Sequence, residues 1–294
     1  MRKNTNKKRT RERINIIDQK KVAFIGAGSM AEGMIAGIVR SGQMPLSQIY
    51  ATNKQNKQRL NELTKRYGIQ TATMDSFPFE EMDMLILAMK PKDADTALES
   101  LKPHIQKDQL ILSVLAGVKS SYIEDMLHEG QPVMRVMPNT SSTIGASATA
   151  LSAGRDVKNE HLSMSRALLS EMGEVYTIQE EQMDIFTGIA GSGPAYFYFL
   201  MERIEEAGEE AGLSKEMSRQ IGTQTLLGAA KMLQETAENP SVLREKITSP
   251  NGTTAAGLDA LDDFGGGEAI KQAVKHAANR SKEISEQQKQ KVTI

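Results

Sequence analysis

The chain of 294 residues contains no cysteine and no tryptophan, and aromatic residues make up only 4% of it. The absence of cysteine excludes disulfides, thiol nucleophiles and Cys-based zinc sites, and it fits a reducing compartment. So few aromatic side chains argue against a surface that stacks nucleic-acid bases. The formal net charge of −1 gives no overall attraction to nucleic acid or to an acidic membrane surface. We therefore expect a cytoplasmic protein with no overall attraction to nucleic acid or to a membrane surface.

Long hydrophobic runs are also missing. The most apolar segment, 186–201, is interrupted by Gly191, Gly193 and Pro194 and is shorter than the roughly 20 residues that a membrane span needs. Residues 1–18 are basic and polar with no apolar run after the charges, so they do not resemble a secretory signal. We expect this segment to be a disordered tail, with a tether to nucleic acid or lipid as the alternative.

The next 160 or so residues alternate short apolar runs with amphipathic stretches, the pattern of strands and helices in turn. Such alternation implies parallel pairing, because each return crossover needs a helix. We expect an α/β domain over residues 19–178 with a Rossmann-type doubly wound sheet. The expected strands are 21–25, 48–52, 82–88, 110–115 and 132–137, with 148–151 and 173–178 as further candidates.

After about Gln179 the pattern becomes helical almost throughout, which predicts an all-α domain over residues 179–294. The expected helices are 193–212, 215–238, one starting at Pro240, one starting near Thr254, and 268–285. The segment 185–200 carries more apolar side chains than a surface helix should expose. We therefore predict that it is buried between subunits of an obligate homodimer.

The first expected strand runs directly into Gly26-Ala-Gly28-Ser-Met30-Ala31, which is G-x-G-x-x-A between a strand and a helix. Two glycines allow a tight turn and close approach to a pyrophosphate, and the following helix offers free N–H groups to the phosphates. The alternative is a structural turn without a ligand. We assign Gly26, Gly28, Ser29 and Met30 to dinucleotide binding.

The end of the second expected strand indicates which dinucleotide binds. NAD sites usually place an acidic residue there for the ribose hydroxyls, but no acidic residue occurs between Glu32 and Glu62. The strand ends instead at Asn53 and Lys54, with Lys57 and Arg59 close behind. This favours NADPH, whose 2′-phosphate is anionic, and leaves NADH as the less preferred cofactor. The alternative is an ordinary solvated face of basic residues.

Three further segments have the composition and position of ligand-binding loops. Ala88-Met-Lys-Pro91 and Met137-Pro-Asn-Thr140 follow expected strands at their carboxyl ends, where doubly wound sheets bind ligands. Ser249-Pro-Asn-Gly-Thr-Thr254 is a turn of small residues that opens a helix. Its N–H groups and hydroxyls could cradle a carboxylate, or it could be an N-cap with a Pro-Asn-Gly turn.

Together these segments resemble the pyrroline-5-carboxylate reductase family from about Lys21 to about Ser285. The resemblance also rests on Arg135-Val-Met-Pro-Asn-Thr140, Gly191-Ser-Gly-Pro-Ala-Tyr196 and Gly257-Leu258. It implies an N-terminal Rossmann domain and a C-terminal helical dimerisation domain, with the partner subunit completing each active site and decamers as a larger assembly. One departure is Asn251-Gly252, where the family commonly has Gly-Gly. Asn tolerates left-handed backbone geometry, so we expect the turn to survive.

The resemblance also implies an activity, the NADPH-dependent reduction of 1-pyrroline-5-carboxylate to L-proline, the last step of proline biosynthesis. In this assignment Thr254 is the catalytic residue and hydrogen-bonds the ring nitrogen. Ser249, Gly252, Thr253 and Thr254 hold the substrate, while Ala88, Lys90, Pro91 and Asn139 lie on the nicotinamide side. The sequence does not distinguish a biosynthetic from an osmoprotective role.

Two other functions stay open from the sequence. β-Hydroxyacid dehydrogenases share the two-domain plan, and Gly188, Gly191 and Gly193 fit their glycine-rich frame, but Phe197 occupies the position of their proton-accepting lysine. A reductase-like protein that binds NADP or proline without turnover is the other alternative. No His, Asp and Glu cluster has metal-ligand spacing, so we expect no metal. The histidines lie outside all these motifs and read as surface groups: His104, His128, His161 and His276.

Overall fold

The computed structural model describes residues 17–292, with side chains described as far as Glu286. Most of the expected tail, 1–18, lies outside the described residues. Ile17, within that expected tail, is 1% exposed and belongs to the hydrophobic core. None of the helices in the described part of the chain is long and apolar enough to cross a membrane.

The chain divides into two compact units, and the first unit is made of two separate segments of the chain. One unit runs as far as Gly191 and resumes at Ala277, and the other spans Ser192–His276. The change of pattern at Gln179 therefore marks the end of the sheet, while the first unit continues beyond it. The returning segment is held by a hydrogen bond from Ser281 Oγ to Asp184 Oδ1 of 2.7 Å.

An eight-stranded sheet forms the centre of the first unit. Its strands in chain order are β1 (Val22–Ile25), β2 (Ile49–Thr52), β3 (Gln70–Thr71), β4 (Met84–Leu87), β5 (Leu110–Ser113), β6 (Val133–Met137), β7 (Ser147–Ala153) and β8 (Gly173–Thr177). Their spatial order is β3-β2-β1-β4-β5-β6-β7-β8, so the chain winds outward from β1 to one side and then from β4 to the other. The predicted Rossmann-type doubly wound sheet is confirmed.

Two details of the sheet differ from the sequence-based expectation. β6 and β7 pair antiparallel, whereas every other pair is parallel. Only a short 3-10 helix, Thr140–Ile144, lies between them, and a short connection suits antiparallel neighbours. The edge strand β3 was not expected, because its two polar residues, exposed Gln70 and half-buried Thr71, leave no apolar pattern.

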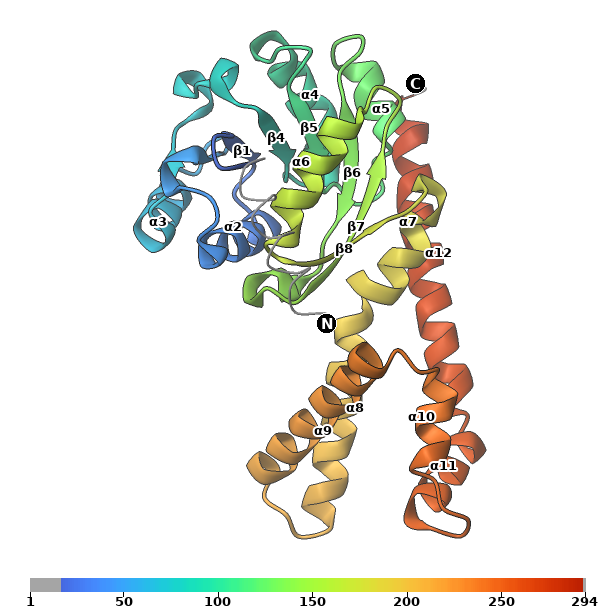
Figure 1. The fold of residues 1–294 in the computed structure, drawn as a ribbon. Helices are drawn as coiled ribbons and strands as arrows, with labels where there is room; N and C mark the ends of the chain where they lie inside the picture. Colours follow the sequence, from blue (N-terminus) through green and yellow to red (C-terminus); the bar gives the residue numbers. More distant parts are fainter. Residues whose placement is uncertain (1–16, 293–294) are drawn as a thin grey trace, which may run out of the picture. The chain divides into compact units, whose positions relative to one another are not determined.

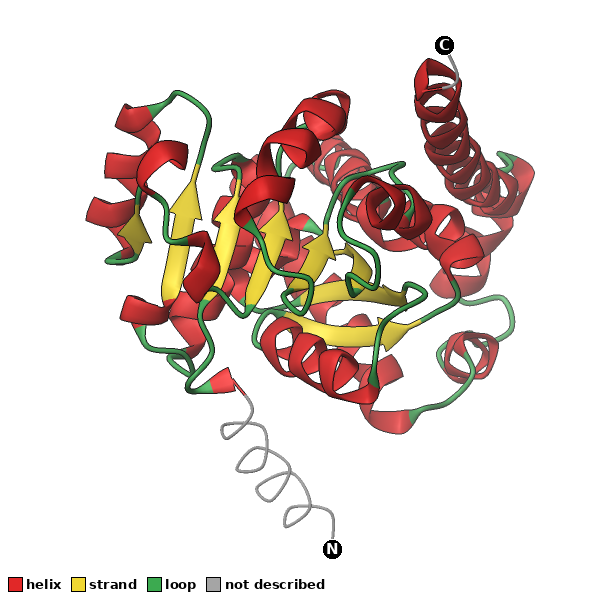
Figure 2. Ribbon diagram, turned by 90° about the horizontal axis from the view of Figure 1, so that it is seen from above, coloured by secondary structure: helices red, strands yellow, loops and turns green. Residues whose placement is uncertain are grey.

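Apolar side chains cover both faces of the sheet, as the near-continuous apolar strands predicted. On β1, Val22 and Phe24 belong to one core cluster while Ala23 and Ile25 belong to the other. Helices lie on both sides of the strands (Figure 2). One face is covered by α2 (Ser29–Ser41), α3 (Lys57–Tyr67) and α6 (Asn159–Ser170), and the other by α4 (Ala94–Leu101) and α5 (Ser120–Met126).

The second unit consists of helices, in agreement with the predicted all-α segment. The helices are α8 (Gly193–Glu210), α9 (Lys215–Thr236), α10 (Pro240–Lys246), α11 (Thr253–Asp263) and the first part of α12 (Gly266–Val292), preceded in the first unit by α7 (Met183–Phe186). α8 and α9 pack as a pair (Figure 1). Their contact is close at Gly222, where a Cβ atom would lie 2.6 Å from Met201 Cε.

Candidate active site

The dinucleotide loop joins β1 to α2 at the carboxyl edge of the sheet. Gly26 has φ of +116°, and a Cβ atom there would lie 2.7 Å from the carbonyl oxygen of Ala88. Ala88 follows β4, and its N–H donates to the carbonyl of Ile25 over 2.9 Å. Both the backbone angle and the close approach of Ala88 therefore require glycine at position 26.

Gly28 differs from Gly26, because nothing in the protein requires it to lack a side chain. It is the N-cap of α2 with φ of −77°, and a Cβ atom there would meet no atom within 4 Å. No side chain caps this helix, so its first N–H groups face an exposed surface at Gly28 and Ser29. A phosphate can approach the backbone here, and the positive end of the helix dipole favours an anion.

The loop after β2 carries the residues expected to meet the adenosine end of the cofactor. Asn53 forms a closed turn with Asn56, whose N–H donates to Asn53 Oδ1 over 2.8 Å while Asn53 Nδ2 donates to the Asn56 carbonyl over 2.8 Å. Lys54 and Lys57 are exposed, and neither takes part in an ion pair within residues 17–286. Their charges are thus free to attract a 2′-phosphate.

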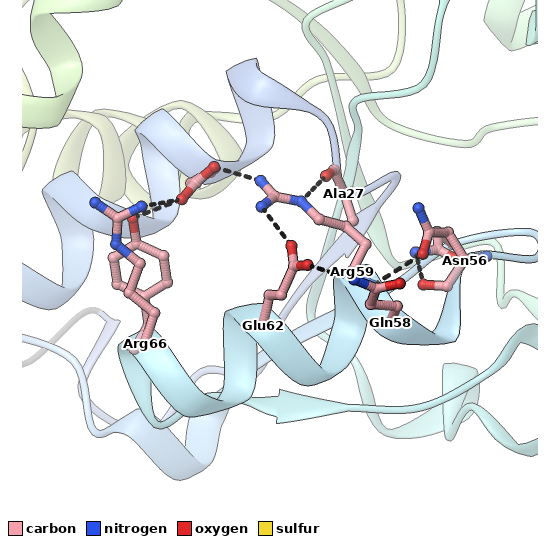
Figure 3. A network of polar contacts seen from close by, with 9 residues as sticks. Ala27, Asn56, Gln58, Arg59, Glu62 and Arg66 are labelled. Carbon is pink, nitrogen blue, oxygen red and sulfur yellow. Dashed lines mark hydrogen bonds and ion pairs between the residues drawn. The ribbon is translucent and has the colours of Figure 1, made fainter.

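Arg59 does not belong with these free cations, and this corrects the sequence-based grouping of Arg59 with Lys57. Its side chain is only 25% exposed, and its guanidinium forms an ion pair with Glu32. Its Nε donates to the Ala27 carbonyl over 3.0 Å, and Nη1 lies 3.4 Å from Glu62 Oε2 (Figure 3). The sequence could not show this, because Glu32 lies 27 residues away along the chain.

The segments expected on the nicotinamide side lie at the same sheet edge. Lys90 is exposed and precedes the short 3-10 helix Pro91–Asp93. Asn139 is buried, and its amide already has protein partners, since Nδ2 donates to the Ala190 carbonyl over 3.1 Å and Oδ1 accepts from the Ser141 N–H over 3.1 Å. Asn139 thus fixes the loop after β6, and direct contact with a cofactor stays a prediction.

A cavity that the sequence did not reveal lies between the loops after β4 and β5. It measures about 260 Å³ and is lined by residues that include Pro91, Gly117, Tyr122 and Ser285. Burial, reinforced by a 2.6 Å hydrogen bond to an aspartate, raises the pKa of Tyr122 above its ordinary value, so this phenol stays protonated. The sequence hints at this cavity only through Ala116-Gly117, a pair of small residues just after an apolar strand.

The turn expected to bind the substrate lies in the second unit. Asn251 has φ of +60°, so the expectation that Asn would accept left-handed geometry is confirmed. The N–H of Gly252 donates to the Ser249 carbonyl over 3.0 Å, and a Cβ atom on Gly252 would lie 2.5 Å from Ser249 Oγ. The turn therefore brings Ser249 and Gly252 into contact.

Thr254 lies inside α11 and does not cap it. Gly252 is the N-cap of α11, so Thr253 and Thr254 are the first two helical residues. No side chain caps the helix, and no hydrogen bond among the described residues uses the Thr254 hydroxyl. The free N–H groups of this first turn and the two hydroxyls suit a carboxylate and a polar ring atom.

Comparison with known proteins matches both parts of the chain. Residues 180–284 match the family model described as pyrroline-5-carboxylate reductase dimerisation, and residues 21–117 match the model described as NADP oxidoreductase coenzyme F420-dependent. Pyrroline-5-carboxylate reductase 1 of Bacillus subtilis (strain 168) is 67% identical over 280 residues, which cover 95% of this chain and 94% of the relative.

Solved structures agree with this match. A pyrroline-5-carboxylate reductase from Coxiella burnetii has a TM-score of 0.82 at 32% identity, covering 90% of this chain and 98% of its own. The Plasmodium falciparum pyrroline carboxylate reductase with NADP bound also has a TM-score of 0.82, at 26% identity, covering 91% of this chain and 99% of its own.

Proposed function

The chain belongs to the pyrroline-5-carboxylate reductase family, as its motifs implied, and from this premise we propose how its residues perform the family's reaction. It is an NAD(P)H-dependent oxidoreductase that acts on a C=N bond and reduces 1-pyrroline-5-carboxylate to L-proline. Within this proposal, residues 19–178 bind the cofactor, while residues 179–294 supply the substrate turn and the dimer surface.

The observation that carries the proposal is that both turns needed for the reaction have the geometry of binding sites. Gly28 leaves its surroundings open to a pyrophosphate, with Ser29 and Met30 beginning the helix that faces it. The turn from Ser249 to Thr254 leaves the first N–H groups of α11 uncapped. The first suits an anionic dinucleotide and the second a small carboxylate.

When bound, the nicotinamide supplies a hydride to the carbon of the C=N bond. The chain's own task is to hold the imine at the correct distance and angle, because alignment supplies much of the rate when the protonated imine is already electrophilic. Ser249, Gly252 and Thr253 hold the carboxylate of the substrate. The Thr254 hydroxyl hydrogen-bonds the ring nitrogen, which is the atom that gains electron density as the hydride arrives.

NADPH is the preferred cofactor in this proposal, and NADH is the less preferred one. Asn53 shapes the loop at the adenosine end, and Lys54 places an exposed charge there with no competing ion pair in the described part of the chain. Ala88, Lys90, Pro91 and the loop fixed by Asn139 form the nicotinamide side.

The apolar surface of the second unit supports a homodimer. Large apolar side chains remain exposed in the single chain, among them Phe199 at 57%, Ile247 at 70% and Phe264 at 92%. Apolar surface of this extent marks a protein–protein interface. We therefore propose an obligate homodimer in which the partner subunit completes each active site. A decamer is the larger assembly to test for. The proposed location is the cytoplasm.

The test is the loss of NADPH absorbance when the purified full chain is mixed with pyrroline-5-carboxylate. We expect turnover, with a higher kcat/KM for NADPH than for NADH, and a dimer or a multiple of it by light scattering. Absence of turnover with either cofactor in folded protein would contradict the enzymatic function. Tight NADPH binding without hydride transfer would instead favour a non-catalytic binding protein.

A further inference from the structure

Arg59 projects from the first turn of α3 into contact with two elements of the cofactor site. Its Nε donates to the Ala27 carbonyl over 3.0 Å, its Nη2 contacts the Glu32 carboxylate, and its Nη1 lies 3.4 Å from Glu62 Oε2 (Figure 3). Ala27 lies between the two glycines of the dinucleotide loop, and Glu32 lies in the first turn of α2. One side chain therefore links α3, α2 and the loop.

The contact with Ala27 fixes the orientation of a peptide group in the proposed dinucleotide loop. The Ala27 carbonyl belongs to the same planar, trans peptide as the Gly28 N–H, so the two groups point in opposite directions. A guanidinium that holds the carbonyl also directs the N–H away from Arg59. No hydrogen bond within the described residues uses this N–H, which leaves it available to a phosphate oxygen.

The charge of Arg59 is already compensated. Glu32 accepts from Arg59, from Arg66 over 2.9 Å and from the Tyr67 hydroxyl over 3.0 Å, and Glu62 lies beside Arg59. The hydrogen bond from Arg59 is the main reason that the pKa of Glu32 lies below its ordinary value. Two carboxylates thus balance two guanidiniums, and this group offers no net positive charge to a 2′-phosphate.

We propose that Arg59 is a positioning residue that orients the Gly28 N–H toward the pyrophosphate, and that it is not a ligand of the 2′-phosphate. Glu32 holds the guanidinium in place and is itself neutralised, so its negative charge does not repel the phosphates at the start of α2. Discrimination of NADPH from NADH then falls to the free charges of Lys54 and Lys57. This inference rests on the proposed cofactor site.

The two roles differ in how they affect the two cofactors. NADPH and NADH share the pyrophosphate, so loss of a residue that orients the loop weakens both by the same factor. They differ only in the 2′-phosphate, so loss of a residue that binds it weakens NADPH alone. The ratio of the two dissociation constants therefore separates positioning from direct contact.

The experiment measures Kd for NADPH and for NADH by fluorescence titration of the full-length protein. Arg59→Lys keeps the charge but loses the Nε contact, and Arg59→Met loses both. We expect either variant to raise both Kd values by roughly five- to tenfold with their ratio unchanged, the size of effect that loss of one hydrogen bond produces. Lys54→Ala and Lys57→Ala should raise the Kd for NADPH alone.

Arg66→Met is the matched control, because Arg66 also binds Glu32 but is 70% exposed and makes no hydrogen bond to the loop. We expect less than a twofold change in either Kd for this variant. An Arg59→Lys protein that retains wild-type affinity for both cofactors would overturn the proposal, as would one that loses affinity for NADPH alone. Binding needs no turnover, so a chain that binds as expected without reducing pyrroline-5-carboxylate would contradict only the proposed function.

Discussion

Replacement of Thr254 tests the proposed reaction at a single hydroxyl. Thr254 is the second residue of α11 and does not cap it, and none of the hydrogen bonds of the described residues uses its hydroxyl. Removal of the hydroxyl should therefore cost no stability. Alanine has the higher helix propensity by up to about 0.7 kcal/mol, so the Tm of Thr254→Ala should be unchanged or slightly raised.

The effect on turnover should be much larger than the effect on stability. If the hydroxyl hydrogen-bonds the ring nitrogen during hydride transfer, Thr254→Ala should lower kcat/KM by roughly ten- to a hundredfold, or about 1.4 to 2.7 kcal/mol of barrier. The Kd for NADPH should stay near the wild-type value, because the residues assigned to the cofactor belong to the other compact unit.

Two further variants at the same position separate the hydroxyl from the shape of the side chain. Thr254→Ser keeps the hydroxyl and should retain most activity, whereas Thr254→Val keeps the shape and should be as slow as Thr254→Ala. Steady-state assays of NADPH oxidation, together with thermal unfolding of each protein, provide the measurements. A Thr254→Val enzyme as fast as the wild type would refute the assigned role.

Three other predictions concern the loop, its ion pair and the dimer surface. Gly26→Ala should destabilise the protein by about 1–3 kcal/mol and abolish NADPH binding, because of φ at +116° and the 2.7 Å approach to the Ala88 carbonyl; a wild-type Tm would contradict this. Glu32 has a lowered pKa in the folded protein, so its stabilising effect is complete above its ordinary value of 4.5 and is lost as the pH falls through the folded value. The Tm difference between wild type and Glu32→Gln should therefore shrink as the pH falls below 4.5. A difference that stays constant would show that the ionised Glu32 carboxylate does not stabilise the fold. Phe197 is 50% exposed in the single chain and should be buried between subunits. Phe197→Asp should therefore be a monomer by light scattering and inactive in the NADPH oxidation assay.

The parts of the fold that could be predicted are those in which the burial of each residue leaves a matching apolar pattern in the sequence. β1 and β4 are buried on both faces, and this leaves an unbroken apolar run in the sequence. Pattern does not encode direction, so the antiparallel pairing of β7 with β6 depends on how the short connection between them folds. β3 consists of only two residues, both polar, which are too few to leave any apolar pattern.

The site was predictable to the extent that each residue's role follows from its own chemistry. The glycines of the loop and the small residues of the turn were assigned in this way, and their contacts with cofactor and substrate stay predictions. The role proposed for Arg59 depends instead on Glu32 and the Ala27 carbonyl, which only the packing of α3 against α2 brings within reach. The hydrogen bonds of Asn139 to Ala190 and Ser141 likewise depend on packing that the sequence does not show, while its contact with a cofactor stays a prediction.

The turn that begins α11 shows why one of two neighbouring positions accepts a side chain and the other does not. Position 251 has φ of +60°, a backbone requirement that glycine or asparagine can meet. Position 252 has an ordinary φ of −84°, but a Cβ atom there would lie 2.5 Å from Ser249 Oγ and 3.1 Å from the Ser249 carbonyl oxygen. Asparagine can therefore replace the first glycine of the family's usual pair without changing the backbone of the turn. Any side chain at the second would displace Ser249, one of the groups proposed to hold the substrate carboxylate.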